Sequence, residues 1–319
     1  MDEIVVFSGG AHPGFATAVC DLLGTPLSPS RRLRFSNDCL QVQLQANCRK
    51  RDVYVVQPLV PPVQEHLVGL LLMLYAARGA SAAQVTAVIP HYAYARSDKK
   101  DAGRISIAAR LVADLIATAG ADRVLTMALH APQVHGFFSV PVDHLTAITE
   151  LAGRFADRDL TNTIVVSPDL GNAKAATSFA RLLGLPVAAG SKQRLADDRV
   201  VIDAIVGDVQ GRDVIILDDE IATGSSVLEL LERLREREVG QIWLACTHGL
   251  FTGTALQRLA AQDDLMEIVS TDTVPLAPDC DVPKLTVCSV APLFADAIRR
   301  IHLGESVSAM FDHVTPPVG

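Results

Sequence analysis

The sequence lacks the cysteine spacing of a metal-binding finger or of a redox motif. Its six cysteines are scattered and no CxxC pair occurs, which is typical of proteins from a reducing compartment. It also lacks the basic region and apolar core of a signal peptide, because the first residues, MDEIVVFSGG, are acidic and then briefly apolar. From these absences we expect a cytoplasmic protein.

Long apolar runs and runs of basic residues are missing too. The longest apolar stretch, residues 67–77, is too short to cross a bilayer. The formal net charge is -8 and no Lys/Arg run is long enough to counter it, which argues against nucleic-acid binding. We therefore expect neither a membrane nor a nucleic acid as a partner. Because the chain is negative overall, a phosphate-binding site would need a local arrangement of donor groups.

Apolar residues, by contrast, are plentiful. They make up 49% of the 319 residues, enough for the cores of about two domains. Strand-like runs alternate with helix-periodic runs, so we expect an α/β fold of mainly parallel sheets flanked by helices, with ligands at the carboxyl ends of the strands. The predicted strands are residues 4–7, 52–57, 85–90, 123–129, 163–168, 213–217 and 241–246.

One segment combines two kinds of binding chemistry. In VIILDDEIATGSSV (214–227), an apolar strand leads directly into Asp218 and Asp219, then into a Thr/Gly/Ser loop and a leucine-rich helical run. The start of a helix offers unpaired N–H groups to a phosphate, whereas two carboxylates suit sugar hydroxyls or a divalent cation. A ribose 5-phosphate group satisfies both halves. The alternative is an ordinary strand-to-helix turn with Asp and Ser as caps.

Polar residues also follow other predicted strands. His130, Asp169, Thr247 and His248 each come at a strand end, where one sheet edge would bring several within reach of one ligand. His130 and Asp169 could hold a hydrated Mg²⁺ through an imidazole and a carboxylate. Singly, such residues are more often a hydrogen-bonded histidine and a helix-capping aspartate.

Two basic segments remain open to more than one interpretation. Arg96 lies in the segment 89–104, which mixes aromatic and cationic residues, and it could bind a phosphate bidentately. Lys192 and Arg194 flank a predicted loop, which is either a plain surface excursion or a mobile lid that brings cations to a reacting phosphate.

An ordered set of segments runs nearly end to end and resembles the ribose-phosphate diphosphokinases, or phosphoribosyl-diphosphate (PRPP) synthases. The segments are FSGGAHP (7–13), RFSN (34–37), VIPHYAYARSDKKD (88–101), LHAPQVHGFF (129–138), PVDHLTA (141–147), VVSPDLGNAK (165–174), LDDEIATGSS (217–226), CTHGLFTG (246–253), TDTVPL (271–276) and SVAPLFADAIRRIHLGESVSAMF (289–311).

The resemblance implies two tandem type I phosphoribosyltransferase-like domains. Residues 1–146, joined by the C-terminal helix 291–304, would form the ATP side and the oligomer contacts, and residues 147–290 would hold ribose 5-phosphate. The implied reaction transfers the diphosphoryl group of ATP to the anomeric hydroxyl of ribose 5-phosphate, giving PRPP and AMP, with Mg²⁺ as cofactor. The implied assembly is a homo-oligomer, commonly a hexamer built from dimers.

The family's functional positions carry over one by one. Lys192 and Arg194 would be catalytic, and His130 and Asp169 would be associated with Mg²⁺. The positions for ribose 5-phosphate are Asp218, Asp219, Thr223, Gly224, Ser225 and Ser226, and those for ATP are Phe35, Asn37, Arg96 and Asp101.

The chain also departs from the family pattern. Cys39 and Ser97 replace a Glu and a Gln near the nucleotide, and Ala128 and Ser139 stand where acids are usual. Ala222 replaces a third Asp in the sugar motif, and Ser225-Ser226 replaces a Gly-Thr. These changes leave two alternatives open: a non-catalytic regulatory subunit, and a diphosphokinase that uses another sugar phosphate or nucleotide donor.

Overall fold

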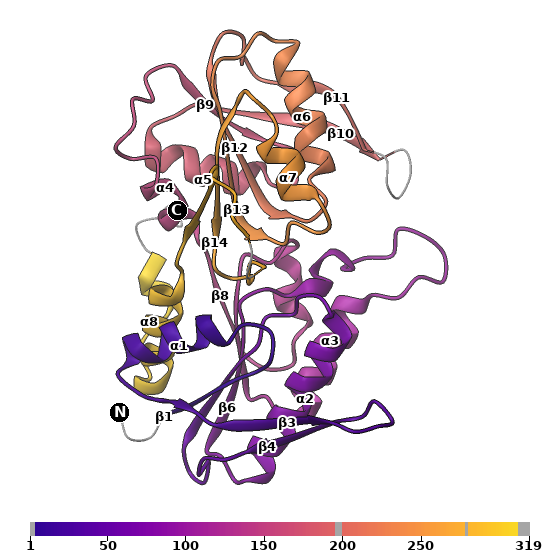
Figure 1. Cartoon of the computed structure of the whole chain (residues 1–319), viewed down its shortest axis with the longest axis vertical. Helices are drawn as coiled ribbons and strands as arrows, with labels where there is room; N and C mark the ends of the chain where they lie inside the picture. The colour runs from indigo at the N-terminus through magenta and orange to yellow at the C-terminus, as the bar shows by residue number, and fades with distance from the viewer. Residues whose placement is uncertain (1–3, 195–199, 278–279, 312–319) are drawn as a thin grey trace. The chain divides into compact units, whose positions relative to one another are not determined.

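The structure, a computed structural model, describes residues 4–194, 200–277 and 280–311, and within 192–203 it describes the backbone alone (Figure 1). The chain divides into two compact units. Unit 1 comprises Met1–Thr146, Thr273–Pro275 and Val290–Met310, and unit 2 comprises Ala147–Asp272, Leu276–Ser289 and Phe311–Gly319. Each unit is described by itself. Among the described residues, no helix combines the length and the apolarity that crossing a membrane requires.

Unit 1 is built on a six-stranded sheet in the order β2-β1-β5-β6-β7-β8, in which every neighbouring pair is parallel. The four inner strands are rich in Val and Ile and are buried almost throughout, as expected for a parallel sheet covered on both faces, whereas the edge strands β2 and β8 are mostly half-buried. Their bounds are β1 Ile4–Ser8, β2 Leu27–Ser28, β5 Asp52–Val56, β6 Gln84–Ile89, β7 Arg123–Met127 and β8 Val142–Leu145.

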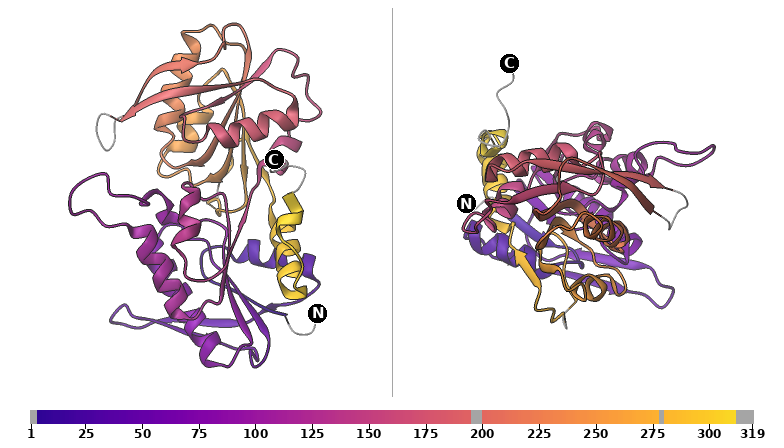
Figure 2. Two further views of the ribbon diagram at one scale, coloured as in Figure 1. Left: turned by 180° about the vertical axis from the view of Figure 1, so that it is seen from behind. Right: turned by 90° about the horizontal axis from the view of Figure 1, so that it is seen from above.

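Helices cover both faces of this sheet (Figure 2). Helices α2 (Val63–Gly79) and α3 (Ala108–Ala119) pack their apolar residues against the alternate strand residues of one face, such as Val53 and Val55. On the other face, helix α1 (Pro13–Leu23) meets the C-terminal helix α8 (Ala291–Leu303), and the rings of Phe15 and Phe294 lie edge to face at 5.3 Å. Unit 1 is therefore completed by a helix from the far end of the chain.

A separate antiparallel hairpin, β3 (Ser30–Arg34) with β4 (Leu40–Leu44), belongs to unit 1 as a two-stranded sheet of its own. The sequence did not predict these strands. β3 (SRRLR) is dominated by arginines and is mostly exposed, so it shows no apolar pattern. β4 (LQVQL) does alternate apolar and polar residues, and its Val42 and Leu44 pack against the core of unit 1, a signal that was missed.

Unit 2 is built on a seven-stranded sheet in the order β11-β10-β9-β12-β13-β14-β15. All neighbouring pairs are parallel except β10 with β11, which is antiparallel. The bounds are β9 Thr163–Ser167, β10 Val187–Arg194, β11 Val200–Val206, β12 Asp213–Ile221, β13 Ile242–Gly249, β14 Leu265–Thr271 and β15 Leu285–Cys288.

The helices of unit 2 also lie on both faces of the sheet. Helices α6 (Ser225–Arg235) and α7 (Ala255–Ala260) share one apolar cluster with alternate residues of β9, β12 and β13. Helices α4 (Ile148–Gly153) and α5 (Ala173–Leu183) cover the other face, where the rings of Phe155 and Phe179 lie 6.0 Å apart. The predicted α/β class, with mainly parallel sheets flanked by helices, is confirmed.

One local expectation was wrong. Asp218 and Asp219 do not follow their strand but lie within β12, because β12 pairs with β13 beyond them, from Asp218 opposite Cys246 to Ile221 opposite Gly249. For the same reason Thr247 and His248 lie within β13. Lys192 and Arg194, which were expected to flank a loop, lie in β10, whose backbone pairs with β11; residues 195–199, between these strands, lie outside the described part of the structure.

Candidate active site

The turn between β12 and α6 depends on Gly224. This residue is the N-cap of α6 and has φ 73° and ψ 0°, a left-handed conformation that favours glycine. A Cβ added here would lie 3.3 Å from Cδ1 of Leu259 on α7, a tight contact. The glycine therefore sets the direction in which α6 begins and lets α7 approach the turn.

The start of α6 is open to an anion. No side chain caps the helix, so its first N–H groups lack a strong side-chain partner. The hydroxyl of Thr223 accepts a long hydrogen bond of 3.5 Å from the backbone N–H of Ser225 and donates to the Ser225 hydroxyl at 3.2 Å. Ser226, in the first turn of α6, is half-buried. Backbone N–H groups, hydroxyls and the helix dipole together suit a phosphate.

The acids of β12 experience strong mutual repulsion. Asp218 is partly buried, and its Oδ1 accepts a hydrogen bond of 2.9 Å from the backbone N–H of Asp219. Burial, together with the charges of Asp219 and Asp169, raises the pKa of Asp218 well above its usual range. Such a group of carboxylates favours a ligand that brings hydroxyl protons or positive charge.

The loop after β9 is fastened to β12 next to these acids. Asp169 accepts a hydrogen bond of 3.1 Å from the backbone N–H of Asn172, and the Ser167 hydroxyl donates to the Asp169 carbonyl at 2.7 Å. The side-chain amide of Asn172 donates to the carbonyl of Leu217 at 3.0 Å. Asn172 was missed in the sequence, although its place three residues after a strand-end aspartate was a usable signal.

The two predicted catalytic cations can be placed by their backbone alone. Lys192 pairs with Ile202 and Arg194 with Val200 across the β10–β11 ladder. Their side chains lie outside the described part of the structure. Their catalytic role stays a prediction.

In unit 1, Phe35 and Asn37 lie in the loop between β3 and β4. The loop is held by hydrogen bonds from Phe35 N–H to the Cys39 carbonyl at 2.9 Å and from Cys39 N–H to Oδ1 of Asn37 at 3.2 Å. The Phe35 side chain is 50% exposed. This hydrogen-bonded loop therefore holds an aromatic ring exposed to solvent, an arrangement that suits contact with a ligand or a partner.

Arg96 and Asp101 lie beside the start of α3. Arg96 is the last residue of a 3-10 turn, Ala93–Arg96, and both side chains are exposed. The hydroxyl of Ser97 accepts a hydrogen bond from Ala108 N–H at 3.1 Å and donates to the Ser106 carbonyl at 3.2 Å, closing the loop that carries Asp101. Ser97 therefore has a structural role that the sequence did not reveal.

His130 is exposed and follows β7 through a tight turn. Ala128 has φ 44°, and the N–H of Leu129 donates to Nε2 of the buried His144 at 2.9 Å. Burial, aided by the nearby His135, lowers the pKa of His144 to about 4, so His144 is neutral at pH 7 and can accept this bond. His144 thereby holds the backbone just before His130.

The predicted residues thus fall into two sets. Unit 2 brings together Asp169, Asp218 and Asp219 with the open start of α6, whereas unit 1 carries His130 and the residues assigned to ATP. Over the described ranges, no three His, Cys, Asp or Glu side chains gather closely enough to hold a metal ion. A Mg²⁺ site needs one or two protein ligands, because waters and substrate phosphates complete the shell.

Comparisons with known proteins agree along the whole chain. Residues 4–120 match the family model of the N-terminal domain of ribose phosphate pyrophosphokinase, and residues 195–312 match that of the phosphoribosyl synthetase-associated domain. The chain is 66% identical over 312 residues, 98% of each protein, to a Streptomyces coelicolor protein provisionally named as a ribose-phosphate pyrophosphokinase. It is 48% identical to the ribose-phosphate pyrophosphokinase of Deinococcus radiodurans, over 97% of this chain and 98% of the relative.

A solved structure is similar over nearly the same length. The crystal structure of phosphoribosylpyrophosphate synthetase from Mycobacterium smegmatis superimposes with a TM-score of 0.89 at 38% sequence identity, covering 95% of this chain and 99% of that one.

Proposed function

The chain belongs to the ribose-phosphate pyrophosphokinase family of transferases, and on that premise we propose that it transfers the diphosphoryl group of ATP to the anomeric hydroxyl of D-ribose 5-phosphate. The products are PRPP and AMP, for nucleotide biosynthesis. The segment from β12 to α6 carries the proposal, because two acids precede an uncapped helix start. Ribose 5-phosphate requires such a pairing, with the acids for its diol and the N–H groups for its phosphate.

In unit 2, the carboxyl groups of Asp218 and Asp219 accept hydrogen bonds from the hydroxyls of the ribose diol. The hydroxyls and N–H groups of Thr223, Ser225 and Ser226 hold the 5-phosphate, and Gly224 sets the turn. Fixing both ends of the sugar aligns the anomeric hydroxyl for attack, and chemistry of this kind gains most from such positioning.

Lys192 and Arg194 stabilise the charge that develops on the transferred diphosphoryl group. Guanidinium and ammonium groups suit this role because they donate several charge-assisted hydrogen bonds to phosphate oxygens. Both residues lie at the end of β10, which pairs with β11, and β11 in turn contacts α6, the helix proposed to hold the 5-phosphate.

In unit 1, the proposed ATP residues are Phe35, Asn37, Arg96 and Asp101. The exposed ring of Phe35, on an outlying hairpin, is suited to reach an adenine of a neighbouring subunit. This assignment entails a dimer-based homo-oligomer, and we also propose that the protein works in the cytoplasm.

Magnesium is the proposed cofactor, with His130 and Asp169 as its protein ligands. The donor chemistry fits, since the repulsion that Asp169 and Asp219 exert on Asp218 is of the kind a divalent cation offsets. When bound, the ion supplies positive charge to the triphosphate. The turn at Ala128 and Leu129, held by His144, sets the position from which His130 approaches it.

Product identification tests the proposal. The purified chain is mixed with ATP, Mg²⁺ and ribose 5-phosphate, and the products are identified by mass spectrometry. We expect sustained formation of AMP and PRPP, which should be abolished in Lys192→Ala. The control variant, Arg237→Gln, changes an exposed cation in the turn after α6 and should retain the activity.

Two outcomes favour the alternatives. The absence of turnover by the chain alone points to a regulatory subunit, which the substitutions at Ala128 and Ser139 motivate. A higher kcat/KM with another pentose phosphate or nucleoside triphosphate points to a different substrate pair, which the exposed Cys39 and the structural use of Ser97 motivate.

A further inference from the structure

Unit 2 has a second polar site, at the opposite edge of its sheet from the proposed sugar site. A pocket of about 430 Å³ is lined in part by Arg154, Arg158, Trp243, Glu267, Lys284 and Thr286. Trp243 and Glu267 are register partners near the starts of β13 and β14, whereas Asp218 and the phosphate loop lie toward the carboxyl end of β12. No step of the proposed reaction uses this pocket.

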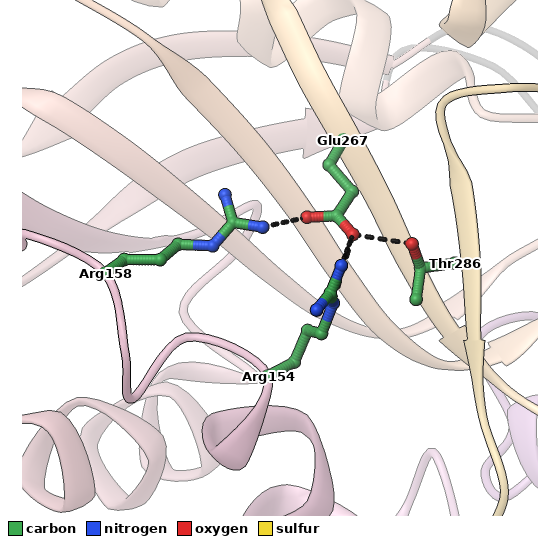
Figure 3. Close-up of polar contacts among 4 residues, drawn as sticks. All are labelled: Arg154, Arg158, Glu267 and Thr286. Atoms are coloured by element: carbon green, nitrogen blue, oxygen red, sulfur yellow. Dashed lines mark hydrogen bonds and ion pairs between the residues drawn. The ribbon is translucent and has the colours of Figure 1, made fainter.

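A carboxylate organises the pocket. Oε1 of Glu267 accepts hydrogen bonds from Arg154 at 2.9 Å and from the Thr286 hydroxyl at 2.6 Å, and Oε2 is paired with Arg158 (Figure 3). Burial opposes ionisation, but the hydrogen bonds from Thr286 and Arg154 and the charge of Arg158 outweigh it, so the pKa of Glu267 is lowered. Glu267 is therefore ionised and fixes both guanidinium groups.

The cations outnumber this acid. Lys284 also lines the pocket, so three cations stand against one carboxylate on a chain with a net charge of -8. The Lys284 ammonium donates one hydrogen bond, to the carbonyl of Gln262 at 2.7 Å, out of its three N–H groups. Each guanidinium has five N–H donors, so hydrogen-bonding capacity remains for a ligand.

The guanidinium of Arg158 is held from its faces as well. Its carbon lies 5.2 Å from the centre of the Phe155 ring and 5.4 Å from that of Trp243. Figure 3 shows that one of its terminal nitrogens points away from Glu267. A rigid arginine with outward donors is preorganised to bind an oxyanion, because little rotamer freedom is left to lose.

We propose that this pocket binds a small multivalent oxyanion, held chiefly by Arg154 and Lys284 with Arg158 fixed beside them. Phosphates and compact polycarboxylates share the required chemistry, which is several oxygens carrying at least two negative charges. A purely structural role accounts for the bonds to Glu267, which tie α4 to β14 and β15, and for the bond from Lys284 to Gln262, but it leaves two N–H donors of Lys284 at the pocket unused.

The tryptophan provides a local probe. Trp243 is the single tryptophan of the chain and lies against Arg158, so its fluorescence reports on this pocket. The whole protein is titrated with inorganic phosphate and, in a parallel arm, with citrate, with chloride added to constant ionic strength. We expect a saturable change with at least one of the two, and the stronger response identifies the anion class.

Variants locate the response. Arg154→Gln and Lys284→Gln should each weaken binding about tenfold, the effect of removing one charge-assisted hydrogen bond. Lys284→Gln leaves every bond to Glu267 in place, so it tests the site without loosening the fold. Arg237→Gln, which removes an exposed cation elsewhere in unit 2, should bind as the parent does.

A further experiment distinguishes anion binding at this pocket from binding at the proposed sugar site. Saturating ribose 5-phosphate, or Ser225→Ala at the start of α6, should leave the tryptophan titration unchanged. The proposal is overturned if the fluorescence response is linear in anion concentration, if Lys284→Gln binds as tightly as the parent, or if Ser225→Ala abolishes the response. It is also overturned if the response depends on protein concentration, because that would place an acidic segment of a second copy in the pocket. AMP formation is measured separately on the same preparation, so that a failure of the proposed activity can be told apart from a failure of anion binding at this pocket.

Discussion

At the scale of single residues, the proposed chemistry of unit 2 depends on Asp218, a carboxyl group whose surroundings disfavour its ionised form. Asp218 is partly buried next to Asp219 and within the electrostatic reach of Asp169, and its pKa is raised as a result. The fold tolerates this repulsion because β12 and its neighbours are otherwise buried and apolar. Strain of this kind at a binding site is relieved by the ligand, which gains affinity from it.

The repulsion makes stability depend on pH. The raised pKa means that the folded state holds the Asp218 proton more tightly than the unfolded chain does, so stability falls as pH rises from the ordinary value of 3.8 toward the folded value. Asp218→Asn removes this loss. In metal-free buffer at pH 7.5, we expect it to unfold with a free energy higher by on the order of 1 kcal/mol.

Urea denaturation across pH measures this difference. The difference should shrink as the pH is lowered and vanish well below 3.8, where the Asp218 carboxyl is protonated in both the folded and the unfolded state. Asp263→Asn, at an exposed aspartate of the same unit, should show no such trend. A loss of stability in Asp218→Asn that is the same at every pH would contradict the repulsion.

Ala128 offers a second test at this scale. Its φ of 44° lies in the left-handed region, which Asp and Asn adopt more readily than Ala does. Ala128→Asp and Ala128→Asn should therefore both fold at least as stably as the parent. If the metal site is merely depleted of acids, Ala128→Asp alone should lower the Mg²⁺ concentration needed for half-maximal activity, by about threefold to tenfold.

The measurement is a Mg²⁺ titration of AMP formation at fixed ATP. The Asn variant isolates the charge from the backbone preference. Equal curves for the Asp and Asn variants would mean that the metal is held without this position.

At the scale of elements, the connection from β12 to α6 joins a long strand to an uncapped helix through one left-handed glycine. The strand continues past both acids, so they lie in a strand that is hydrogen-bonded to β13 and not in a free loop. The helix start has no side-chain cap, which leaves its N–H groups for the proposed phosphate. The precision of the proposed sugar site thus comes from backbone pairing, which fixes the distance between the acids and the phosphate loop.

Substituting the glycine should separate strain from crowding. Gly224→Ala places a Cβ 3.3 Å from Leu259 in addition to the left-handed strain, whereas Gly211→Ala, at φ 65° with no atom within 4 Å, has the strain alone. We expect each to cost about 1 kcal/mol of stability from strain, and Gly224→Ala to cost more.

The activity of the two variants should differ as well. Gly224→Ala should raise the KM for ribose 5-phosphate about tenfold or more by shifting the start of α6, while Gly211→Ala should leave it unchanged. Thermal unfolding and steady-state kinetics give both quantities. A normal KM in Gly224→Ala would show that the turn does not set the phosphate site.

At the scale of the whole molecule, unit 1 is discontinuous in sequence. Helix α8 fills the sheet face beside α1, with Phe294 fully buried, and the hydroxyl of Tyr54 in β5 donates to the carbonyl of Ile298 at 3.4 Å. His302 and Asp52 are paired at 2.7 Å at the end of the same helix. A change near the C-terminus should therefore destabilise strands at the N-terminus.

Phe294→Ala tests this dependence. Truncating a fully buried phenylalanine costs about 3 to 5 kcal/mol, whereas Leu303→Ala, 55% exposed on the same helix, should change stability by less than about 0.5 kcal/mol. Hydrogen exchange read by mass spectrometry should place the loss of protection in β1 and β5. Loss confined to α8 itself would mean that the sheet is stable without the helix.

The sequence predicted what is local and could not predict what depends on distant pairing. The apolar strands, the acids and the phosphate loop were recognisable because strand pattern, carboxylates and glycine lie within a few residues of one another. The extension of β12 past Asp218 depends on its partner β13, and in the β3–β4 hairpin the arginine-rich β3 has no apolar pattern of its own, although β4 alternates apolar and polar residues. The roles of Asn172 and Ser97 come from hydrogen bonds to residues far along the chain or across a loop.

The place of α8 in unit 1 also has a consequence during synthesis. A ribosome makes the strands of unit 1 before unit 2 and their covering helix α8 after most of it, so part of the apolar sheet face stays uncovered while most of unit 2 is produced. Exposed faces of this kind attract chaperones and favour aggregation. The arrival of α8 competes with those encounters, and we expect slower translation between unit 1 and α8 to lower the yield of active protein.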